Sequence, residues 1–170
     1  MFASRLTRAK WALLSTLRQR PLCHSATVLF GVTSGFTAAE ITALRSTSSE
    51  DVKIIELRTQ TAFHFKPGQW CDLVIPGDLC SNYLRPQDEG YLVGGFSMTS
   101  TPAQARTKNG VVQLAVQQSP NRPVSWLLST AKEGDIVGLR AGGKFWCDIN
   151  KAKRPVLLIS GGIGITPFMS

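Results

Sequence analysis

Short apolar segments, separated by polar turn residues, recur along the chain from residue 40 onward. Val112, Leu114 and Val116 alternate with residues of the opposite character, which is the period-two pattern of a half-buried strand. Segments of this kind predict six strands, at residues 41–44, 52–58, 69–75, 91–98, 111–117 and 136–139. Residues 123–130 predict one short helix. Many short antiparallel strands with one helix indicate an all-β fold, an antiparallel closed barrel that leaves no sheet edge exposed.

Turn residues separate these segments. Pro67 and Gly68 suit the two central positions of a type II turn, and residues 108–110 and 132–135 predict two further turns. Residues 77–90 are polar, rich in turn formers and long for a connection between strands. We therefore expect an exposed loop there.

The C-terminal residues carry a different pattern. Residues 155–159 form a continuous apolar run, which predicts a buried strand of the parallel type. Residues 160–164 hold three glycines, which let the backbone turn sharply and approach a ligand. Thr166 suits an N-cap and Pro167 the first position of a helix. Together these features predict an anion site suited to a dinucleotide pyrophosphate, with an ordinary strand–turn–helix corner as the alternative.

One strand and the start of a helix cannot bury a core of their own. We therefore expect residues 151–170 to be the truncated start of a second, α/β domain. The chain is then a fragment, a truncated gene model or a short isoform, and the sequence does not distinguish these three.

The net charge of +8 is unevenly distributed over the 170 residues. Residues 1–39 hold five basic residues and no acidic one, which leaves 14 basic and 11 acidic residues in the body. An Arg-rich, acid-free leader with Leu residues on one helical face predicts a mitochondrial presequence at residues 1–30 and a location in the matrix, with a disordered basic tail as the alternative. Because the body is only mildly basic, we expect no nucleic-acid partner, and no segment is apolar enough to predict a membrane span.

Four cysteines and two histidines show no metal-ligand spacing, so we expect no metal site and no disulfide framework. Cys71 and Cys147 lie in apolar segments that read as strands, and both are expected to behave as small buried hydrophobes. No Ser/His/Asp set or carboxylate pair identifies a catalytic acid, base or nucleophile.

Two motifs carry a resemblance to a known family. The GG-x-G-x-T-P form of residues 161–167 resembles the signature that opens the nicotinamide-nucleotide half of the ferredoxin–NADP reductase family. The turn at residues 66–70, followed by Gly94-Gly95-Phe96-Ser97, resembles the flavin-binding barrel of the same family, where a PGQ turn precedes Arg-x-Tyr-Ser. The resemblance implies an FAD-binding barrel over residues 31–150, a start of the NAD(P)-binding domain at 151–170, and the cofactors FAD and NAD or NADP.

The resemblance also assigns roles to residues. It places the hydroxyl of Ser97 near the N5 and O4 edge of the flavin, Phe96 against the flavin or its ribityl chain, and the backbone of Met98 in contact with it. The alternative is a plain core strand with Phe96 inward and Ser97 outward. The full set of implied cofactor-binding residues is Phe96, Ser97, Met98, Ser125, Gly161, Gly162, Ile163, Gly164, Ile165 and Thr166.

The chain departs from the family pattern at the phosphate end. Gly94 stands where the family has the arginine that pairs with the FAD pyrophosphate, although residues 93–97 and the leader look most like a vertebrate mitochondrial subgroup in which glycine would be the norm. Arg122 is a candidate to supply the missing charge from another direction. The resemblance thus implies a flavin-dependent oxidoreductase that passes a hydride between NAD(P)H and FAD, with an unknown electron acceptor. The alternative is a non-catalytic barrel that has lost FAD and acts as a partner-binding surface.

Overall fold

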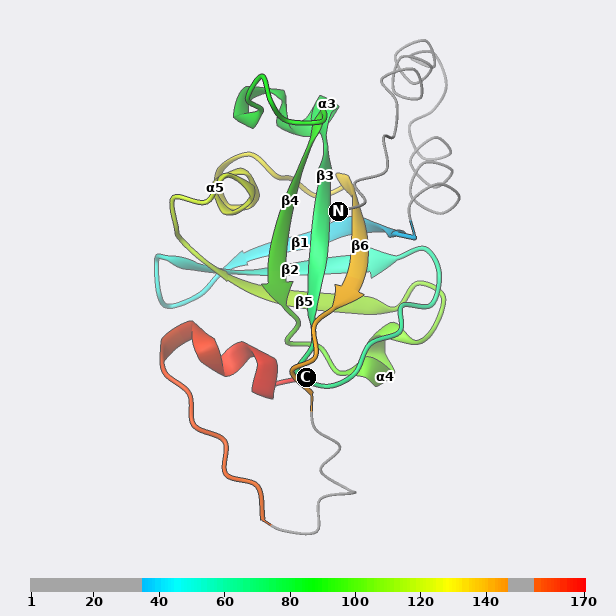
Figure 1. The fold of residues 1–170 in the computed structure, drawn as a ribbon, viewed down its shortest axis with the longest axis vertical. Coiled ribbons are helices and arrows are strands. Elements are labelled where there is room, and N and C mark those ends of the chain that lie inside the picture. The colour runs from blue at the N-terminus through cyan, green and yellow to red at the C-terminus, as the bar shows by residue number, and fades with distance from the viewer. Residues whose placement is uncertain (1–34, 147–154) are drawn as a thin grey trace.

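The computed structural model describes residues 35–146 and 155–170, and the predicted leader lies outside these residues. The described chain contains six strands and few helices (Figure 1). The strands are β1 (Thr37–Ser46), β2 (Val52–Thr59), β3 (Trp70–Pro76), β4 (Tyr91–Ser97), β5 (Val111–Gln117) and β6 (Ile136–Gly142). The helices are α3 (Gly77–Cys80), η1 (Ser81–Tyr83), α4 (Pro102–Ala105), α5 (Arg122–Ser129) and η3 (Gly162–Phe168).

The strands form one antiparallel sheet in the order β4-β3-β6-β1-β2-β5. An antiparallel bridge between Met98 and Leu114 joins the end of β4 to β5, and the backbone N–H of Thr99 donates to the carbonyl of Gln113 at 2.8 Å. The two outer strands of the order therefore meet, and the sheet closes on itself. The predicted all-β antiparallel barrel is confirmed.

The core lies inside this barrel and under α5. Val112, Leu114 and Val116 are buried, as their alternation along β5 predicts. Trp126 of α5 is fully buried, and its indole Nε1–H donates to the carbonyl of Leu79 at 2.8 Å. The predicted single helix of the barrel is thus present and closes one side of the core beside β4 (Figure 1).

Three short helices were not predicted. α3 and η1 lie in the segment expected to be an exposed loop, where Cys80 is only 1% exposed and its Sγ donates to the carbonyl of Ile75. α4 begins with a capping box in which Thr101 and Gln104 satisfy each other's backbone N–H groups. Because the Cys80 side chain is buried, residues 77–90 pack partly against the barrel and do not form the fully exposed loop that was expected.

The prediction for residues 155–159 is wrong. These residues form no strand, and Leu157 and Ile159 are 82% and 80% exposed, because no described strand lies beside them to supply hydrogen bonds. The glycine segment continues into the 3-10 helix η3, so Thr166 lies inside a helix and does not cap one. η3 lies against the barrel next to β5.

Contacts at the chain's last residues hold η3 on the barrel rim. The ring of Phe168 lies 5.8 Å from that of Phe145, and the backbone N–H of Gly68 donates to the Ser170 Oγ at 2.7 Å. Gly68 has a φ of +88°, and the N–H of Gln69 donates to the carbonyl of Lys66, as the predicted type II turn requires.

Candidate functional site

β4 presents its residues alternately to the two faces of the sheet. Leu92, Gly94 and Phe96 face inward, while Val93 and Ser97 lie on the outer face. Phe96 is 8% exposed and belongs to the core, so the inward orientation given above as the alternative is the one present. The partly exposed Ser97 ends the strand and leaves its side chain available on the outer surface. Met98 is fully buried at the barrel seam.

Trp70 lies directly opposite Ser97 in the register of β3 and β4, so the two side chains share the outer face. A Cβ built on Gly142 would lie 2.9 Å from Cη2 of Trp70 and 3.1 Å from Cζ2 and Cζ3, which means that one flat face of the indole rests on this glycine. The residue is 37% exposed, and the exposed part is the other side of the ring. Trp70 therefore presents an aromatic surface on the outer face of the sheet, on the strand that pairs with Ser97.

None of the sequence motifs assigned a role to Trp70. The residue follows the PGQ turn directly, and the turn is held against the end of β6 by its glutamine. The Gln69 side chain accepts a hydrogen bond from the backbone N–H of Lys66 at 2.8 Å and donates to the carbonyl of Gly143 at 2.8 Å. The sequence feature that could have identified Trp70 is thus an aromatic residue at the first strand position after this turn.

The start of α5 lies against the inner face of β4. A Cβ built on Gly94 would lie 2.7 Å from Cε2 of Phe96 and 2.8 Å from Cβ of Pro123. Ser125, in the first turn of α5, is half-buried, and its backbone N–H donates to the carbonyl of Asn121 at 2.9 Å. The fold therefore brings together the two segments to which the resemblance assigned flavin binding, and it leaves no free space at Gly94 for the arginine of the family pattern.

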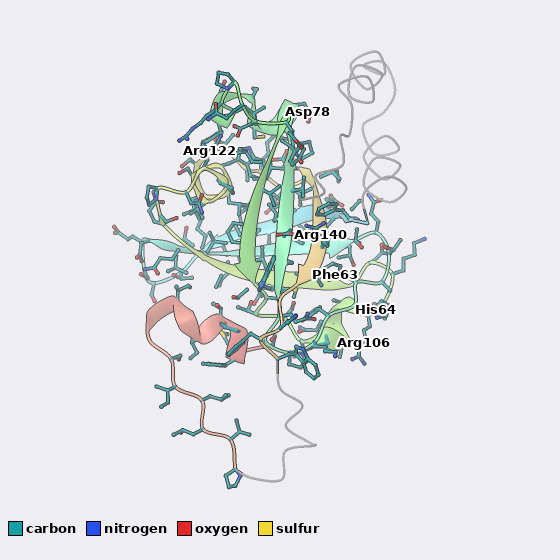
Figure 2. The ribbon with its side chains drawn as sticks, in the orientation of Figure 1. Phe63, His64, Asp78, Arg106, Arg122 and Arg140 are labelled. Atoms are coloured by element: carbon teal, nitrogen blue, oxygen red, sulfur yellow. The ribbon has the colours of Figure 1, made fainter. Side chains whose placement is uncertain are left out.

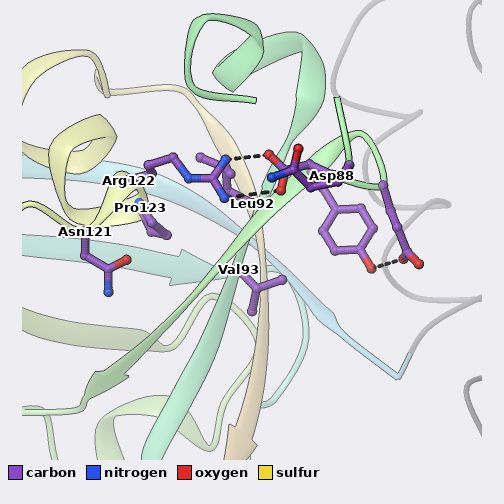
Figure 3. Close-up of a pocket in the computed structure, with 9 residues that line it drawn as sticks. Asp88, Leu92, Val93, Asn121, Arg122 and Pro123 are labelled. Atoms are coloured by element: carbon purple, nitrogen blue, oxygen red, sulfur yellow. Dashed lines mark hydrogen bonds and ion pairs between the residues drawn. The ribbon is translucent and has the colours of Figure 1, made fainter. Parts of the chain in front are cut away.

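A groove with a volume of about 340 Å³ lies between β4, residues 87–89 and the start of α5 (Figure 3). Arg122 crosses it to form an ion pair with Asp88, and its Nη1 also donates to the carbonyl of Tyr83 at 2.8 Å. The hydrogen bonds from Arg122 lower the pKa of Asp88 to about 2. Arg122, expected as a source of the missing positive charge, is thus paired with a carboxylate in this structure.

The nicotinamide candidates lie apart from this groove, on η3. Thr166 is buried and Ile165 is half exposed, whereas nothing lies within 4 Å of a Cβ built on Gly161, Gly162 or Gly164. The N–H of Gly164 donates to the carbonyl of Gly161 at 3.0 Å within the 3-10 turn, and Ile163 is partly buried. These residues do not form the strand–turn–helix cradle that the sequence predicted.

Charged residues elsewhere do not add to the site. Figure 2 shows Arg122 and Asp78 at the end of the barrel near α3, and His64 and Arg106 at the opposite end, near α4. In the part of the chain that the structure describes, no group of His, Cys, Asp or Glu side chains is arranged to hold a metal ion. Cys71 is buried, and burial raises the pKa of its thiol to about 12, while Cys147 lies outside the described residues. None of the helices within residues 35–146 and 155–170 has the length and hydropathy of a membrane span.

Comparisons with known proteins agree with the barrel. The chain is 39% identical over 110 residues to "Oxidoreductase NAD-binding domain-containing protein 1" of Xenopus laevis, covering 64% of this chain and 31% of the relative. The human protein of that name is 35% identical over 128 residues, covering 72% and 37%. A flavohemoprotein of Bacillus cereus is 32% identical over 123 residues, covering 69% and 30%. The expected likeness to the vertebrate subgroup is confirmed, and no family model matches the chain.

Solved structures show the same architecture. The ferredoxin reductase in carbazole 1,9a-dioxygenase matches with a TM-score of 0.60 and 26% identity, covering 79% of this chain and 37% of that one. Phthalate dioxygenase reductase matches with a TM-score of 0.58 and 22% identity, covering 79% and 38%, which supports the fold alone. The chain spans about a third of the length of the curated relatives that it matches.

Proposed function

Since the chain belongs to the ferredoxin reductase family, we propose that it forms the flavin-binding barrel of an oxidoreductase that transfers a hydride between NAD(P)H and FAD. The observation that carries the proposal is the outer face at the end of β4, where Ser97 stands beside the indole of Trp70. The curated relatives are named as oxidoreductases and flavohemoproteins, which does not favour the alternative of a barrel that has lost its flavin.

The residues at this end of β4 fit a planar, partly polar ring. Trp70 offers an aromatic surface for stacking, and Ser97 offers a hydroxyl that donates or accepts a hydrogen bond according to the protonation of the atom it meets. Phe96 supports Ser97 from the core side, and the Met98 bridge fixes the strand end. Bound FAD would supply the hydride chemistry itself, while these side chains orient the ring and limit the access of water.

The phosphate end fits less well. Gly94 has no side chain, Arg122 is paired with Asp88, and Ser125 is the remaining polar candidate at the start of α5. We therefore expect this chain to purify with at most substoichiometric FAD, measured by flavin absorbance after extraction.

Binding of FAD to the full chain, followed by quenching of tryptophan fluorescence, tests the proposal. Trp70→Ala should weaken binding about tenfold, since loss of a stacking partner and its buried area costs roughly 1–1.5 kcal/mol. Trp146→Ala is the matched control, because Trp146 is also exposed but lies under the Nζ of Lys66, 3.5 Å from its ring centroid. Absence of any FAD binding, or equal losses in both variants, would contradict the proposed site.

The remaining parts of the proposal concern the partners and the location. We assign the nicotinamide nucleotide to residues 161–166, in a conformation other than η3, and leave the electron acceptor unassigned.

We propose the mitochondrial matrix as the location, because the Arg-rich leader at residues 1–30 has the composition of a presequence. A fluorescent reporter fused to residues 1–40 should enter mitochondria, and a reporter spread through the cytosol would contradict the proposed location.

A further inference from the structure

The groove beside β4 lies where the phosphate groups of a flavin nucleotide would extend. Val93 lines the groove and Ser97 ends the same strand, so the two are separated by four residues, or about 13 Å of extended backbone. A ribityl chain leaving a ring at Ser97 and following β4 toward α5 would bring its phosphate into this groove. The charges of the groove therefore determine whether the phosphate is recognised.

These charges do not favour an anion. Arg122 directs Nη1 and Nη2 at the carboxylate of Asp88, with 3.2 Å between Nη2 and Oδ1, and also donates to the Tyr83 carbonyl (Figure 3). The second carboxylate, Glu89, lies in the same groove and accepts a hydrogen bond from the hydroxyl of Tyr91 at 2.7 Å. Among the residues that line the groove, two carboxylates stand against one guanidinium and leave a net negative charge, while the guanidinium of Arg85 acts on Asp88 from outside the lining.

The backbone of β4 does not admit a replacement cation. A side chain at position 94 would begin with a Cβ that overlaps Phe96 and Pro123, at 2.7 and 2.8 Å. Only the aromatic ring is free to move, because Pro123 belongs to α5 and is itself buried. Among the residues that line the groove, the cation available to a phosphate is therefore Arg122, and Asp88 pairs with it.

We propose that this barrel recognises its flavin through the ring end alone, and that the Asp88–Arg122 ion pair determines this specificity by withholding Arg122 from phosphate groups. Riboflavin, FMN and FAD then bind with nearly equal affinity. This inference rests on the proposed flavin function, and it specifies which part of the cofactor the chain recognises.

The test is a comparison of the dissociation constants of the three flavins for the full chain, by fluorescence titration at low and high salt. The constants for FAD and riboflavin should agree within about threefold and change little with salt, because no charge pairs with phosphate. FAD binding more than tenfold tighter than riboflavin would overturn the inference while leaving the proposed function intact. No binding of any of the three would overturn both.

Two variants separate the roles of the ion pair. Asp88→Asn should release Arg122 and tighten FMN and FAD about tenfold relative to riboflavin, as expected for one charge-assisted hydrogen bond. The double variant Asp88→Asn/Arg122→Gln removes the pair without changing the net charge of the groove and should leave the ratio unchanged, because Arg122 does not serve the phosphate in the parent chain. An unchanged ratio in Asp88→Asn, or a lower relative affinity for FAD in the double variant, would overturn the proposal.

Riboflavin serves as the internal reference, since any general loss of folding weakens all three flavins together and leaves their ratio unaltered. Asp78→Asn is the matched control, because Asp78 is exposed on α3 at the same end of the barrel and does not line the groove. It should change neither the individual constants nor their ratio, and a tightening equal to that of Asp88→Asn would also overturn the assignment to the ion pair.

Discussion

Two adjacent glycines in β4 meet very different surroundings. The Cβ that Gly94 lacks would collide with Phe96 and Pro123, whereas that of Gly95 would lie 3.8 Å from Cε3 of Trp70, an ordinary contact distance. Both glycines occupy extended backbone that any residue adopts, so the difference between them is one of packing.

Gly94→Ala should lower the free energy of unfolding by about 1–3 kcal/mol, because an added methyl group forces Phe96 or α5 to move. Gly95→Ala is the control and should change it by less than about 0.5 kcal/mol. Urea denaturation followed by circular dichroism measures both. Equal stabilities for the two variants would show that the start of α5 adjusts without cost.

Sequence reasoning reached some of these residues and missed others. The order of the motifs located Gly94 and Ser97, since motif order does not depend on strand pairing. The partnership of Ser97 with Trp70 depends on the register between β3 and β4, and a change of one residue would have put Trp70 opposite a residue of the other face. That register follows from the three-dimensional closure of the sheet, which no local pattern in the sequence specifies.

Among the elements, the strands were predicted well because alternation marks a face buried in the core. α3, η1 and α4 were missed because elements of three or four residues are too short to show a helical period. The apolar run at 155–159 misled for a different reason. A run of this kind indicates burial only where a neighbouring strand pairs with it, and no such neighbour is among the described residues.

Several contacts join the segment carrying α3 and η1 to α5. Arg122 pairs with Asp88 and donates to the carbonyl of Tyr83, Trp126 donates to the carbonyl of Leu79, and the hydroxyls of Tyr83 and Thr130 share a hydrogen bond. The pKa of Asp88 is about 2 in the folded chain, below its ordinary value of 3.8. The ion pair therefore contributes its full stabilisation above about pH 4 and loses it as the pH falls toward 2.

Asp88→Asn should accordingly be less stable than the parent chain at pH 7 and should show a smaller loss of stability between pH 4 and pH 2. Denaturant midpoints measured across this range test the expectation, with Asp78→Asn as the control that keeps the parent profile. Parallel profiles for the parent and Asp88→Asn would mean that other carboxylates dominate the acid response.

On the scale of the whole molecule, the barrel is complete while the nucleotide segment is not arranged as a site. The glycine-rich residues lie in η3, held on the barrel rim through Phe168 and Ser170, and the exposed run before them has no partner strand. A pyrophosphate cradle needs a strand and a helix held in fixed relation.

We therefore expect no measurable NAD(P)H oxidation by the 170-residue chain with an artificial electron acceptor. A longer chain that extends this one by the C-terminal portion of a matched relative should restore activity, and it serves as the positive control. Steady-state absorbance at the reduced-nucleotide band compares the two. Comparable turnover from the shorter chain would contradict the inference that the glycine-rich residues of η3 do not form a nucleotide-binding site.

The position of β6 in the sheet also governs how the barrel is made. β6 is the last strand along the chain among the described residues, yet it lies between β3 and β1 and pairs with both. Until residues 136–142 emerge from the ribosome, the β3–β4 hairpin and the β1–β2–β5 sheet are joined by the short seam where Met98 and Thr99 meet Leu114 and Gln113, and β3 and β1 each have an unpaired edge. We therefore expect the barrel to close late in synthesis, when β6 pairs with both β1 and β3 across a long sequence separation.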